Sequence, residues 1–267
     1  IIGAAIIVLL AYGYYRANYK ISVSSYQLNS KKIPGSIRIA QISDFHNKRI
    51  GFKQHHIISR IKSLSPDIVV FTGDLLNVRM LSTKPSKQLI IGLQRHFPIY
   101  YIRGNHEEKC KKYGAFKKFI EKTNVKLLIN TYLNLEDDKN NKKWKQICIT
   151  GIDDYEFFKE GEWEKKLREI RRCLRKDCYK VLFSHRPEFL KLYADLDFDL
   201  VLSGHAHGGQ FRFPGVRPGF YSPDQGFLPK YVCGLFRERN TTMIVSRGIG
   251  GPVLLSRVFN KPELVLV

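Results

Sequence analysis

The chain has 267 residues, of which 43% are hydrophobic and 26% charged, a composition typical of a globular protein with one large α/β domain or two small ones. Its 45 lysines and arginines outnumber 24 acidic residues, and the formal charge of +21 indicates either a lysine-rich solvated surface or an anionic partner such as phospholipid, nucleic acid or a phosphorylated substrate. The five cysteines are odd in number and contain no Cys-x-x-Cys pair, which excludes a complete set of disulfides within one chain and argues against a structural zinc knuckle. We expect mostly free thiols, and no bond between Cys173 and Cys178, although these two could approach each other.

Residues 1–15 are apolar, and Arg16 ends this segment. The segment is about one turn shorter than the ~20 residues that span a bilayer. The sequence starts at Ile rather than Met, so upstream residues could complete a span. A signal peptide or a core helix is the alternative. Because no small-x-small cleavage site follows and three tyrosines suit a membrane interface, we expect a membrane anchor over residues 1–18. A connector or edge strand follows over residues 19–36.

From residue 37 onward, apolar strands alternate with amphipathic helices, which predicts βαβ units within one domain over residues 37–267. Residues 136–143 are charged and predict a hairpin loop, whereas residues 214–229 are rich in Gly and Pro and predict a lid or substrate wall. A further helix is expected after Pro187. The predicted strands are 37–42, 68–71, 98–102, 125–128, 132–135, 146–152, 179–183, 200–202, 210–213, 243–246 and 263–267, and the predicted helices are 54–64, 86–94 and 163–174.

Polar side chains follow five of these strands, at the point where each strand ends. In open α/β sheets, functional groups gather at the carboxyl ends of the strands. Two divalent ions about 3.5–4 Å apart need a bridging carboxylate with nitrogen and oxygen ligands on either side, and Mn, Fe and Zn accept such mixed ligation. The strand-end residues therefore predict a site for two divalent metal ions. They are Asp44, His46, Asp74, Asn105, His106, His185, His205 and His207.

Each of these residues alone has an ordinary structural explanation. An Asp after a strand is often a helix N-cap, Asn105 beside Gly104 suits a turn, and a histidine is often a satisfied surface or core residue. Taken together, their shared position at strand ends in an α/β order favours a common site. Three other histidines lie outside this pattern, and we expect them on the surface or in packing contacts. They are His55, His56 and His96.

In chain order the motifs read Asp-x-His, Gly-Asp, Gly-Asn-His-Glu, a lone His and Gly-His-x-His, and over residues 43–210 the chain resembles the calcineurin-like metallophosphoesterases. The segments at 151–154, 208–210, 246–250 and 262–263 resemble a membrane-anchored or exported bacterial branch, whose relatives include UDP-2,3-diacylglucosamine pyrophosphatases. This resemblance implies a four-layer αββα sandwich with two metals. It also implies a catalytic domain outside the cytoplasm, with the cytoplasmic face as the alternative.

The resemblance also implies a role for each strand-end residue. The first ion would be held by Asp44, His46 and His207, and the second by Asn105, His185 and His205. Asp74 would bridge both ions, and His106 would not be a ligand but would act on the phosphoryl group as electrostatic stabiliser or general acid. Glu107 stands where many relatives carry Asp, which leaves open whether it orients His106.

These expectations predict an enzyme that hydrolyses a phosphodiester, phosphomonoester or pyrophosphate bond with a hydroxide activated by two metals. The basic surface and the apolar segment favour a membrane-linked or nucleotide-linked substrate. A nuclease or broad-specificity phosphatase is the alternative, and a non-catalytic scaffold is disfavoured because every ligand position is filled. Arg103 and Arg186 adjoin strand-end motifs, and they either bind substrate phosphate or form ion pairs with neighbouring acids.

Overall fold

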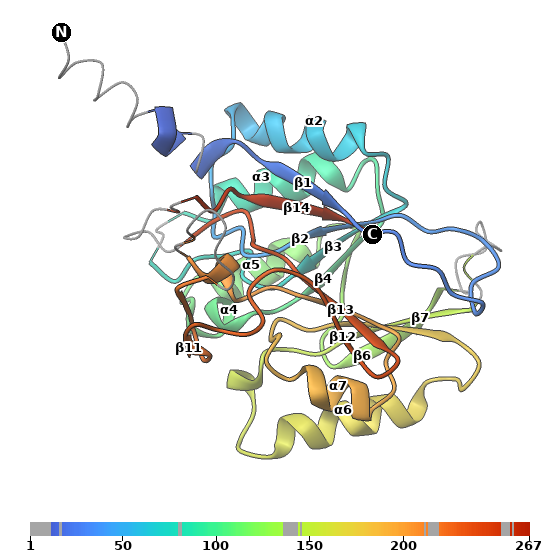
Figure 1. The fold of residues 1–267 in the computed structure, drawn as a ribbon. Helices are drawn as coiled ribbons and strands as arrows, with labels where there is room; N and C mark the ends of the chain where they lie inside the picture. Colours follow the sequence, from blue (N-terminus) through green and yellow to red (C-terminus); the bar gives the residue numbers. More distant parts are fainter. Residues whose placement is uncertain are drawn as a thin grey trace, which may run out of the picture.

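The computed structural model describes residues 12–15, 18–79, 82–135, 144, 146–210, 212, 219–251, 257 and 259–267. Two six-stranded sheets pack face to face, and helices cover their outer faces (Figure 1). The predicted α/β class is therefore confirmed.

The first sheet combines strands from the N-terminal half with the C-terminal strand, in the order β1-β14-β2-β3-β4-β5. Strands β2 to β5 run parallel, as the alternation of strands and helices predicts. Every residue of β2, β3 and β4 is buried, because parallel strands in such a sheet are covered on both faces. The strands are β1 Ser22–Ser25, β2 Ile39–Ile42, β3 Ile68–Thr72, β4 Ile99–Ile102, β5 Val125–Leu127 and β14 Glu263–Leu266.

The second sheet has the order β12-β13-β9-β8-β7-β6. Its four inner strands are parallel, and the two edge strands β6 and β12 are antiparallel to their neighbours. A separate two-stranded hairpin, β10–β11, follows the end of β9 in the chain. The strands are β6 Thr131–Asn134, β7 Ile147–Gly151, β8 Tyr179–Phe183, β9 Leu200–Ser203, β10 Tyr221–Ser222, β11 Gly226–Phe227, β12 Gly234–Glu238 and β13 Thr241–Val245.

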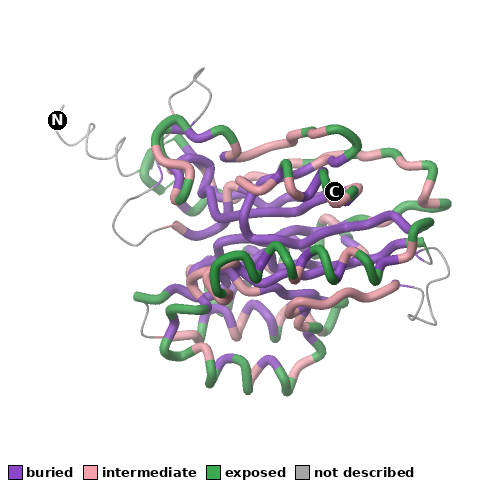
Figure 2. The backbone as a smooth tube through the Cα atoms, turned by 90° about the horizontal axis from the view of Figure 1, so that it is seen from below, coloured by how far each residue is buried: buried purple, intermediate pink, exposed green. Residues whose placement is uncertain are grey.

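The layers are held together by three apolar clusters. One lies between the sheets, where Val70 and Ile102 of the first sheet belong to the same cluster as Val181 and Leu202 of the second. The other two lie under the helices, with α2, α3 and α5 on the first sheet and α6 and α7 on the second. The buried residues occupy the middle of the molecule, and exposed residues lie on the outer side of the helices (Figure 2). The helices are α2 His55–Ser63, α3 Lys84–Leu93, α4 Asn105–Lys109, α5 Tyr113–Ile120, α6 Glu162–Cys173 and α7 Leu190–Asp195, and the 3-10 turns are η1 Phe52–Gln54, η4 Tyr155–Phe157 and η5 His207–Gly209.

The segment predicted as a connector or edge strand contains β1, which pairs with β14 at the edge of the first sheet, so the edge-strand alternative is confirmed. Other elements differ from the sequence predictions. The helices α4 and α5 and the strand β12 were not predicted. The two helices have only one or two turns and so give only a short periodic signal, and β12 is only partly buried and so lacks a run of apolar residues. The predicted strand over 210–213 is wrong for Gln210 and Arg212, because the turn η5 redirects the chain there, and its other two residues lie outside the described ones.

The predicted membrane anchor falls largely on residues that the structure does not describe, namely 1–11, 16 and 17. Across the described ranges, no helix combines the length and apolarity that crossing a bilayer requires. Asn18 is buried, its backbone carbonyl accepts a hydrogen bond from the Lys48 ammonium, and its side-chain oxygen accepts one from the Arg257 amide 3.2 Å away. The predicted charged loop at 136–143 also lies outside the described residues.

The prediction of mostly free thiols is confirmed, and the structure adds one disulfide. Cys148 in β7 forms a disulfide with Cys178, which precedes β8, and their Cα atoms are 6.0 Å apart. The register between β7 and β8 sets Cys148 opposite Lys180 and so brings Cys178 within reach, a relation that the sequence alone does not reveal. Cys110, Cys173 and Cys233 are free, as expected.

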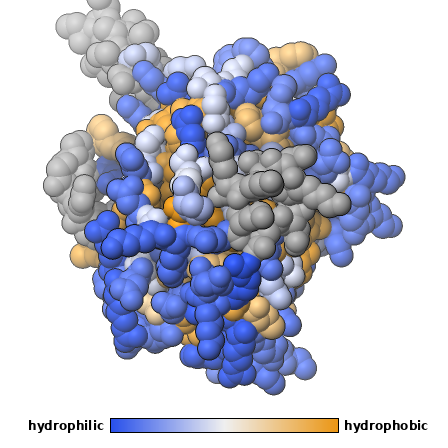
Figure 3. All heavy atoms as spheres, turned by 90° about the vertical axis from the view of Figure 1, so that its right-hand side faces the viewer, coloured by the Kyte–Doolittle hydropathy of each residue, from blue (hydrophilic) through white to orange (hydrophobic). Residues whose placement is uncertain are grey.

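A large cavity lies at the amino ends of the strands. Its volume is about 1120 Å³, and it is lined by residues between Ser25 and Ile39 together with the first residues of β7, β8 and β9. The face of the molecule at this end carries hydrophilic side chains around apolar ones (Figure 3).

Candidate metal centre

The strand-end residues meet at one edge of the sandwich, opposite that cavity. Asp44 and His46 follow β2, Asp74 follows β3, and His185 follows β8. Because the strands that carry these residues are parallel within each sheet and the two sheets face each other, their carboxyl ends open onto the same space. Asn105 and His106 begin α4 after β4, and His205 and His207 follow β9.

The backbone at these positions adopts an unusual conformation. Five of the seven predicted metal ligands have positive φ angles: 50° at Asp44, 52° at His46, 53° at Asp74, 66° at His205 and 48° at His207. Non-glycine residues avoid this left-handed region, and each such residue costs about 1–3 kcal/mol, which persists mainly at functional sites. The fold therefore holds these side chains in place at the expense of stability.

Two glycines allow the loops to approach closely. A Cβ atom on Gly104 would overlap the Asp74 carboxylate, and one on Gly204 would overlap the side chains of Ser43 and Asp44. The glycines of the Gly-Asn-His and Gly-His-x-His motifs thus leave room for the two carboxylates.

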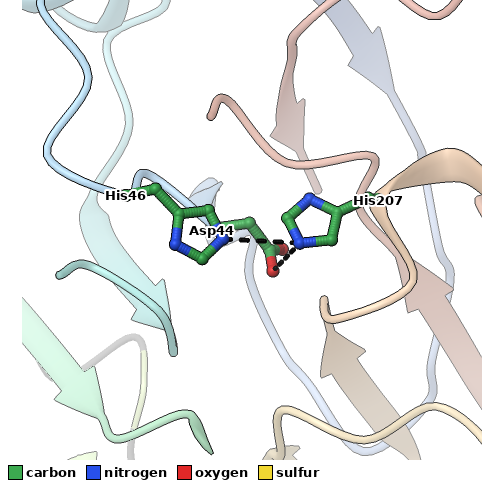
Figure 4. Close-up of side chains that lie close together, drawn as sticks. All are labelled: Asp44, His46 and His207. Atoms are coloured by element: carbon green, nitrogen blue, oxygen red, sulfur yellow. Dashed lines mark hydrogen bonds and ion pairs between the residues drawn. The ribbon is translucent and has the colours of Figure 1, made fainter. Parts of the chain in front are cut away.

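The first cluster consists of Asp44, His46 and His207, whose side chains point toward one another from the two sheets (Figure 4). The Nε2 atom of His207 lies 3.4 Å from Nε2 of His46 and 3.6 Å from Oδ1 of Asp44. All three side chains are buried. Two imidazole nitrogens and a carboxylate oxygen this close together fit a divalent metal ion.

The second cluster consists of Asp74, His185 and His205, with Asp74 situated between the two clusters. Oδ2 of Asp74 lies 3.3 Å from Nε2 of His185 and 3.7 Å from Nε2 of His46. A carboxylate that faces ligands of both clusters has the position that a bridging ligand needs.

The hydrogen bonds of two imidazoles leave their inward nitrogens free for an ion. Nδ1 of His46 donates to the carbonyl oxygen of Leu76 over 3.1 Å, and Nδ1 of His185 donates to that of Thr72 over 2.8 Å. Nε2 of His185 is buried without a hydrogen-bond partner. Metal-binding histidines commonly donate their other N–H to a carbonyl in this way, so the residues present fit divalent ions.

The charge states of His46, His205 and Asp74 agree with metal binding, whereas that of His185 does not. Burial alone would lower the pKa of His185, but the facing carboxylates of Asp74 and Asp44 raise it to about 10, so this ring must lose a proton to bind an ion. Burial lowers the pKa of His46 to about 3 and that of His205 to about 4, so both rings are neutral at physiological pH, the form in which imidazole binds metal. Burial alone would raise the pKa of Asp74, but the facing His185 and His106 hold it well below its usual value, so this side chain is a carboxylate.

Asn105 and His106 point into the same site from the start of α4. Oδ1 of Asn105 is buried without a hydrogen-bond partner, so this neutral oxygen is available as a ligand. The backbone N–H of His106 donates to Oδ1 of Asp74 over 2.9 Å, and its Nδ1 accepts from the backbone N–H of Val78 over 3.3 Å. The hydrogen of His106 therefore sits on Nε2, which lies 4.0 Å from Oδ2 of Asp74.

Glu107 does not orient His106. Its carboxylate accepts hydrogen bonds from the backbone N–H groups of Asp74, Leu76 and Gly104 over 2.8–2.9 Å. It thereby ties the loop after β3 to the turn after β4 and fixes the backbone of Asp74.

The two arginines next to the motifs form ion pairs. Arg103 donates two hydrogen bonds to Asp153 and stacks on Phe157, with its guanidinium carbon 3.8 Å from the ring centre. Arg186 is fully buried and donates to both carboxylate oxygens of Asp154. Neither arginine lines the pocket at the site, so the arrangement matches the ion-pair alternative rather than direct phosphate binding.

Three residues at the site were missed by sequence reasoning. A pocket of about 240 Å³ opens onto the strand-end residues, and its wall includes Lys109, Glu156 and Asp224. Lys109 lies one turn after His106 on α4 and pairs with Glu156 at 2.6 Å. Asp224 comes from the β10–β11 hairpin, within the segment predicted as a lid or wall, and nothing in the local sequence pattern singles it out.

Comparison with known proteins agrees with this geometry. Residues 37–209 match the family model described as calcineurin-like phosphoesterase. The chain is 30% identical over 253 residues to the uncharacterized metallophosphoesterase Cj0846 of Campylobacter jejuni, covering 92% of this chain and 62% of that protein. It is 26% identical over 268 residues to a transmembrane protein with metallophosphoesterase domain from Danio rerio, covering 96% of this chain and 59% of that protein. The chain thus spans less than two thirds of these two relatives.

The chain is also similar in sequence to a further bacterial protein and in fold to a solved structure. The chain is 27% identical over 266 residues to the uncharacterized metallophosphoesterase YkuE of Bacillus subtilis, covering 96% of this chain and 88% of that protein. The crystal structure of TT1561 from Thermus thermophilus superposes with a TM-score of 0.50 at 12% identity, covering 80% of this chain and 90% of that one. This last similarity concerns the fold alone.

Proposed function

The chain belongs to the calcineurin-like phosphoesterase family, and we propose that it hydrolyses a phosphate ester or phosphoanhydride bond with the help of two divalent metal ions. The observation that carries this proposal is the position of Asp74 at the carboxyl ends of both sheets, where it forms one group of potential metal ligands with His185 and His205 and another with His46 and His106. Family membership implies divalent ions, and the clusters supply the donors for them.

In this proposal Asp74 would serve both ions, one of which would be held by Asp44, His46 and His207 and the other by Asn105, His185 and His205. When bound, the ions supply positive charge to the phosphoryl oxygens and increase the acidity of water. The buried walls around Asp44 and Asp74 exclude bulk solvent, which strengthens every charge interaction within the site.

His106 is proposed to act on the leaving group. Because its Nδ1 accepts a hydrogen bond from Val78, its Nε2 carries the hydrogen and faces the site. A donor in that position gives its proton to the leaving oxygen as the bond to phosphorus breaks, or stabilises charge on a phosphoryl oxygen.

The proposed substrate is a phosphorylated small molecule or a lipid-linked phosphate. The pocket of about 240 Å³ suits a phosphoryl group with a compact leaving group. The formal charge of +21 favours an anionic substrate, whereas Lys109 on the pocket wall is already paired with Glu156. Hydrolysis of nucleic acid is the alternative, which the same basic surface supports.

A phosphate-release screen of the metal-loaded protein tests this function. Substrates should include alkyl and aryl phosphodiesters, phosphomonoesters, nucleotide pyrophosphates, lipid-linked phosphates and single-stranded DNA, each with the Asp74→Asn variant as a control. Release from small or lipid-linked substrates, lost in Asp74→Asn, supports the proposal. Preferential cleavage of DNA, with affinity that falls steeply as salt rises, would favour the nuclease alternative.

Membrane attachment through residues 1–18 also remains a proposal, which the name of the Danio rerio relative supports only by analogy. We expect the full chain to sediment with membranes and a form that starts at Ala17, which keeps the buried Asn18, to stay in the supernatant with the same specific activity. Recovery of the uncleaved full chain in the supernatant would contradict the anchor.

A further inference from the structure

His205 is held differently from the other histidines of the site. Whereas His46 and His185 use Nδ1 for a backbone carbonyl and leave Nε2 free, His205 uses Nε2. That atom lies 2.8 Å from Oδ2 of Asp224 and 2.9 Å from Nη1 of Arg186. If His205 binds an ion, as the proposed function assumes, Nδ1 is the nitrogen that remains for it.

The two contacts of Nε2 demand opposite tautomers. A carboxylate only accepts hydrogen bonds, and a guanidinium only donates them. If Nε2 carries the hydrogen, it donates to Asp224 and Nδ1 keeps a lone pair. If Nε2 accepts from Arg186, the hydrogen sits on Nδ1, which then cannot bind a metal ion.

Asp224 removes this conflict because it also accepts a hydrogen bond from Nη1 of Arg186. The rest of that guanidinium is already bound, since Nε and Nη2 donate to Asp154 and Nη2 donates to Glu156 over 3.1 Å. The other acid near Nη1 is Glu188, at 3.7 Å, which is beyond hydrogen-bond distance. Without Asp224, the acceptor within reach of Nη1 would be Nε2 of His205.

The hairpin holds Asp224 in place for this task. Asp224 lies in the turn between β10 and β11, and the neighbouring Gln225 is fixed by two hydrogen bonds to the backbone of Tyr231, over 2.9 and 3.0 Å. The backbone of Phe220 donates to Gly209 over 3.1 Å, which attaches the hairpin to the loop that carries His207. The side chain of Asp224 thus reaches His205 from a fixed support.

We propose that Asp224 is a positioning residue for the second metal ion: by accepting hydrogen bonds from both His205 and Arg186, it keeps the hydrogen of His205 on Nε2 and the Nδ1 lone pair available for the ion. This inference rests on the proposed function, in which His205 is a ligand. It gives the Gly- and Pro-rich segment a defined role at the metal centre. Carboxylates that orient a metal-binding histidine contribute about 10–100-fold to metal affinity.

The test measures tautomer and ion binding separately, in the full chain. Nitrogen-15 spectra of histidine-labelled, metal-free protein report which ring nitrogen of His205 carries the hydrogen, with His205→Gln to assign the signal. Calorimetric titration with Mn²⁺ reports the affinity of each ion. The variants are Asp224→Ala, Asp224→Asn, whose amide oxygen still accepts a hydrogen bond, and Asp195→Ala, which removes an exposed acid paired with Arg239 far from the site.

We expect the hydrogen on Nε2 in the wild type, in Asp224→Asn and in Asp195→Ala, and on Nδ1 in Asp224→Ala. Asp224→Ala should lower the affinity for one ion about 10–100-fold and leave the affinity for the other unchanged, while both affinities of Asp224→Asn stay near those of the wild type. The Asp224 side chain is 38% exposed, so its truncation should not unfold the protein, which a thermal melt checks.

The inference is overturned if Asp224→Ala keeps the hydrogen of His205 on Nε2 and leaves both ion affinities unchanged. It is also overturned if Asp224→Asn lowers the affinity for the ion as much as Asp224→Ala does. A wild type that binds no ion at this site would contradict the proposed function instead, and the tautomer measurement would still decide whether Asp224 and Arg186 control the ring of His205.

Discussion

The two ends of the sandwich offer contrasting spaces. The larger cavity, about 1120 Å³, lies at the amino ends of the strands and is lined mainly by the segment from Ser25 to Ile39. The smaller pocket, about 240 Å³, lies at the carboxyl ends and is lined by Asp74, His106 and other strand-end residues. Among the residues that the structure describes, the clusters with metal-binding geometry all lie at the second end. The direction of the strands and the polar residues that follow them, rather than volume, therefore locate the proposed active site.

The largest effect should follow from substitution of Asp74, whose carboxylate lies between the two clusters. Asp74→Asn keeps the shape of the side chain but removes the charge that both ions would share, so we expect loss of at least one ion. Hydrolysis should fall by more than about 10²–10³-fold, which is the loss when a single electrostatic donor is removed. Metal analysis and phosphate release measure the two effects. If the variant retains two ions with unchanged affinity, Asp74 is not a bridge.

His106→Ala should have the next largest effect and leave both ions bound. A general acid contributes about 10²–10⁴-fold, and we expect a loss of that size with an alkyl phosphodiester. The loss should shrink with a nitrophenyl phosphodiester, whose leaving oxygen departs without a proton. An equal loss with both substrates would mean that His106 stabilises charge on the phosphoryl oxygens. A drop in metal content would instead make His106 a ligand.

Arg103→Ala should change stability and not substrate binding. Its partner Asp153 is buried, and removing one member of a buried ion pair costs about 3–5 kcal/mol. We expect the free energy of unfolding to fall by about 2–4 kcal/mol. The loss should be somewhat smaller than the full cost because Asn130 still donates a hydrogen bond to Asp153 over 3.2 Å. Urea unfolding and the Michaelis constant are the measurements, with Arg175→Ala at an exposed ion pair as the control. A raised Michaelis constant at unchanged stability would restore the phosphate-binding hypothesis.

The smallest effect should come from a substitution at the amino ends of the strands, where the large cavity lies. Leu28 is partly buried against the core between the sheets and lines the large cavity. Leu28→Ala should lower the free energy of unfolding by about 1 kcal/mol, with ion affinity and hydrolysis unchanged. A large loss of hydrolysis in a variant that remains folded would show that the cavity end takes part in function.

The same contrast explains what the sequence could predict. Asp44, Asp74 and His205 were found because each follows a short apolar strand beside small residues, and such a signal is contained in a few consecutive positions. Parallel strand order then brings them together without further information. Most strands and the helices α2, α3 and α6 were predicted for the same reason, since their apolar periodicity is local.

What was missed depends on contacts distant in sequence. Asp224 reaches His205 only because the hairpin is attached near Gly209, and the Cys148–Cys178 bond depends on the register between β7 and β8. The role of Glu107 likewise depends on backbone amides of another loop. These relations follow from strand register and from contacts between neighbouring loops, which no short pattern records.

The central claim is that the carboxyl ends of both sheets hold two ions with Asp74 between them. Anomalous scattering from crystals of the Mn²⁺-loaded protein tests it most directly. We predict two peaks, one beside Asp44, His46 and His207 and one beside Asn105, His185 and His205, with Asp74 in contact with both. A single peak away from Asp74, or ions bound only at other sites, would contradict the account.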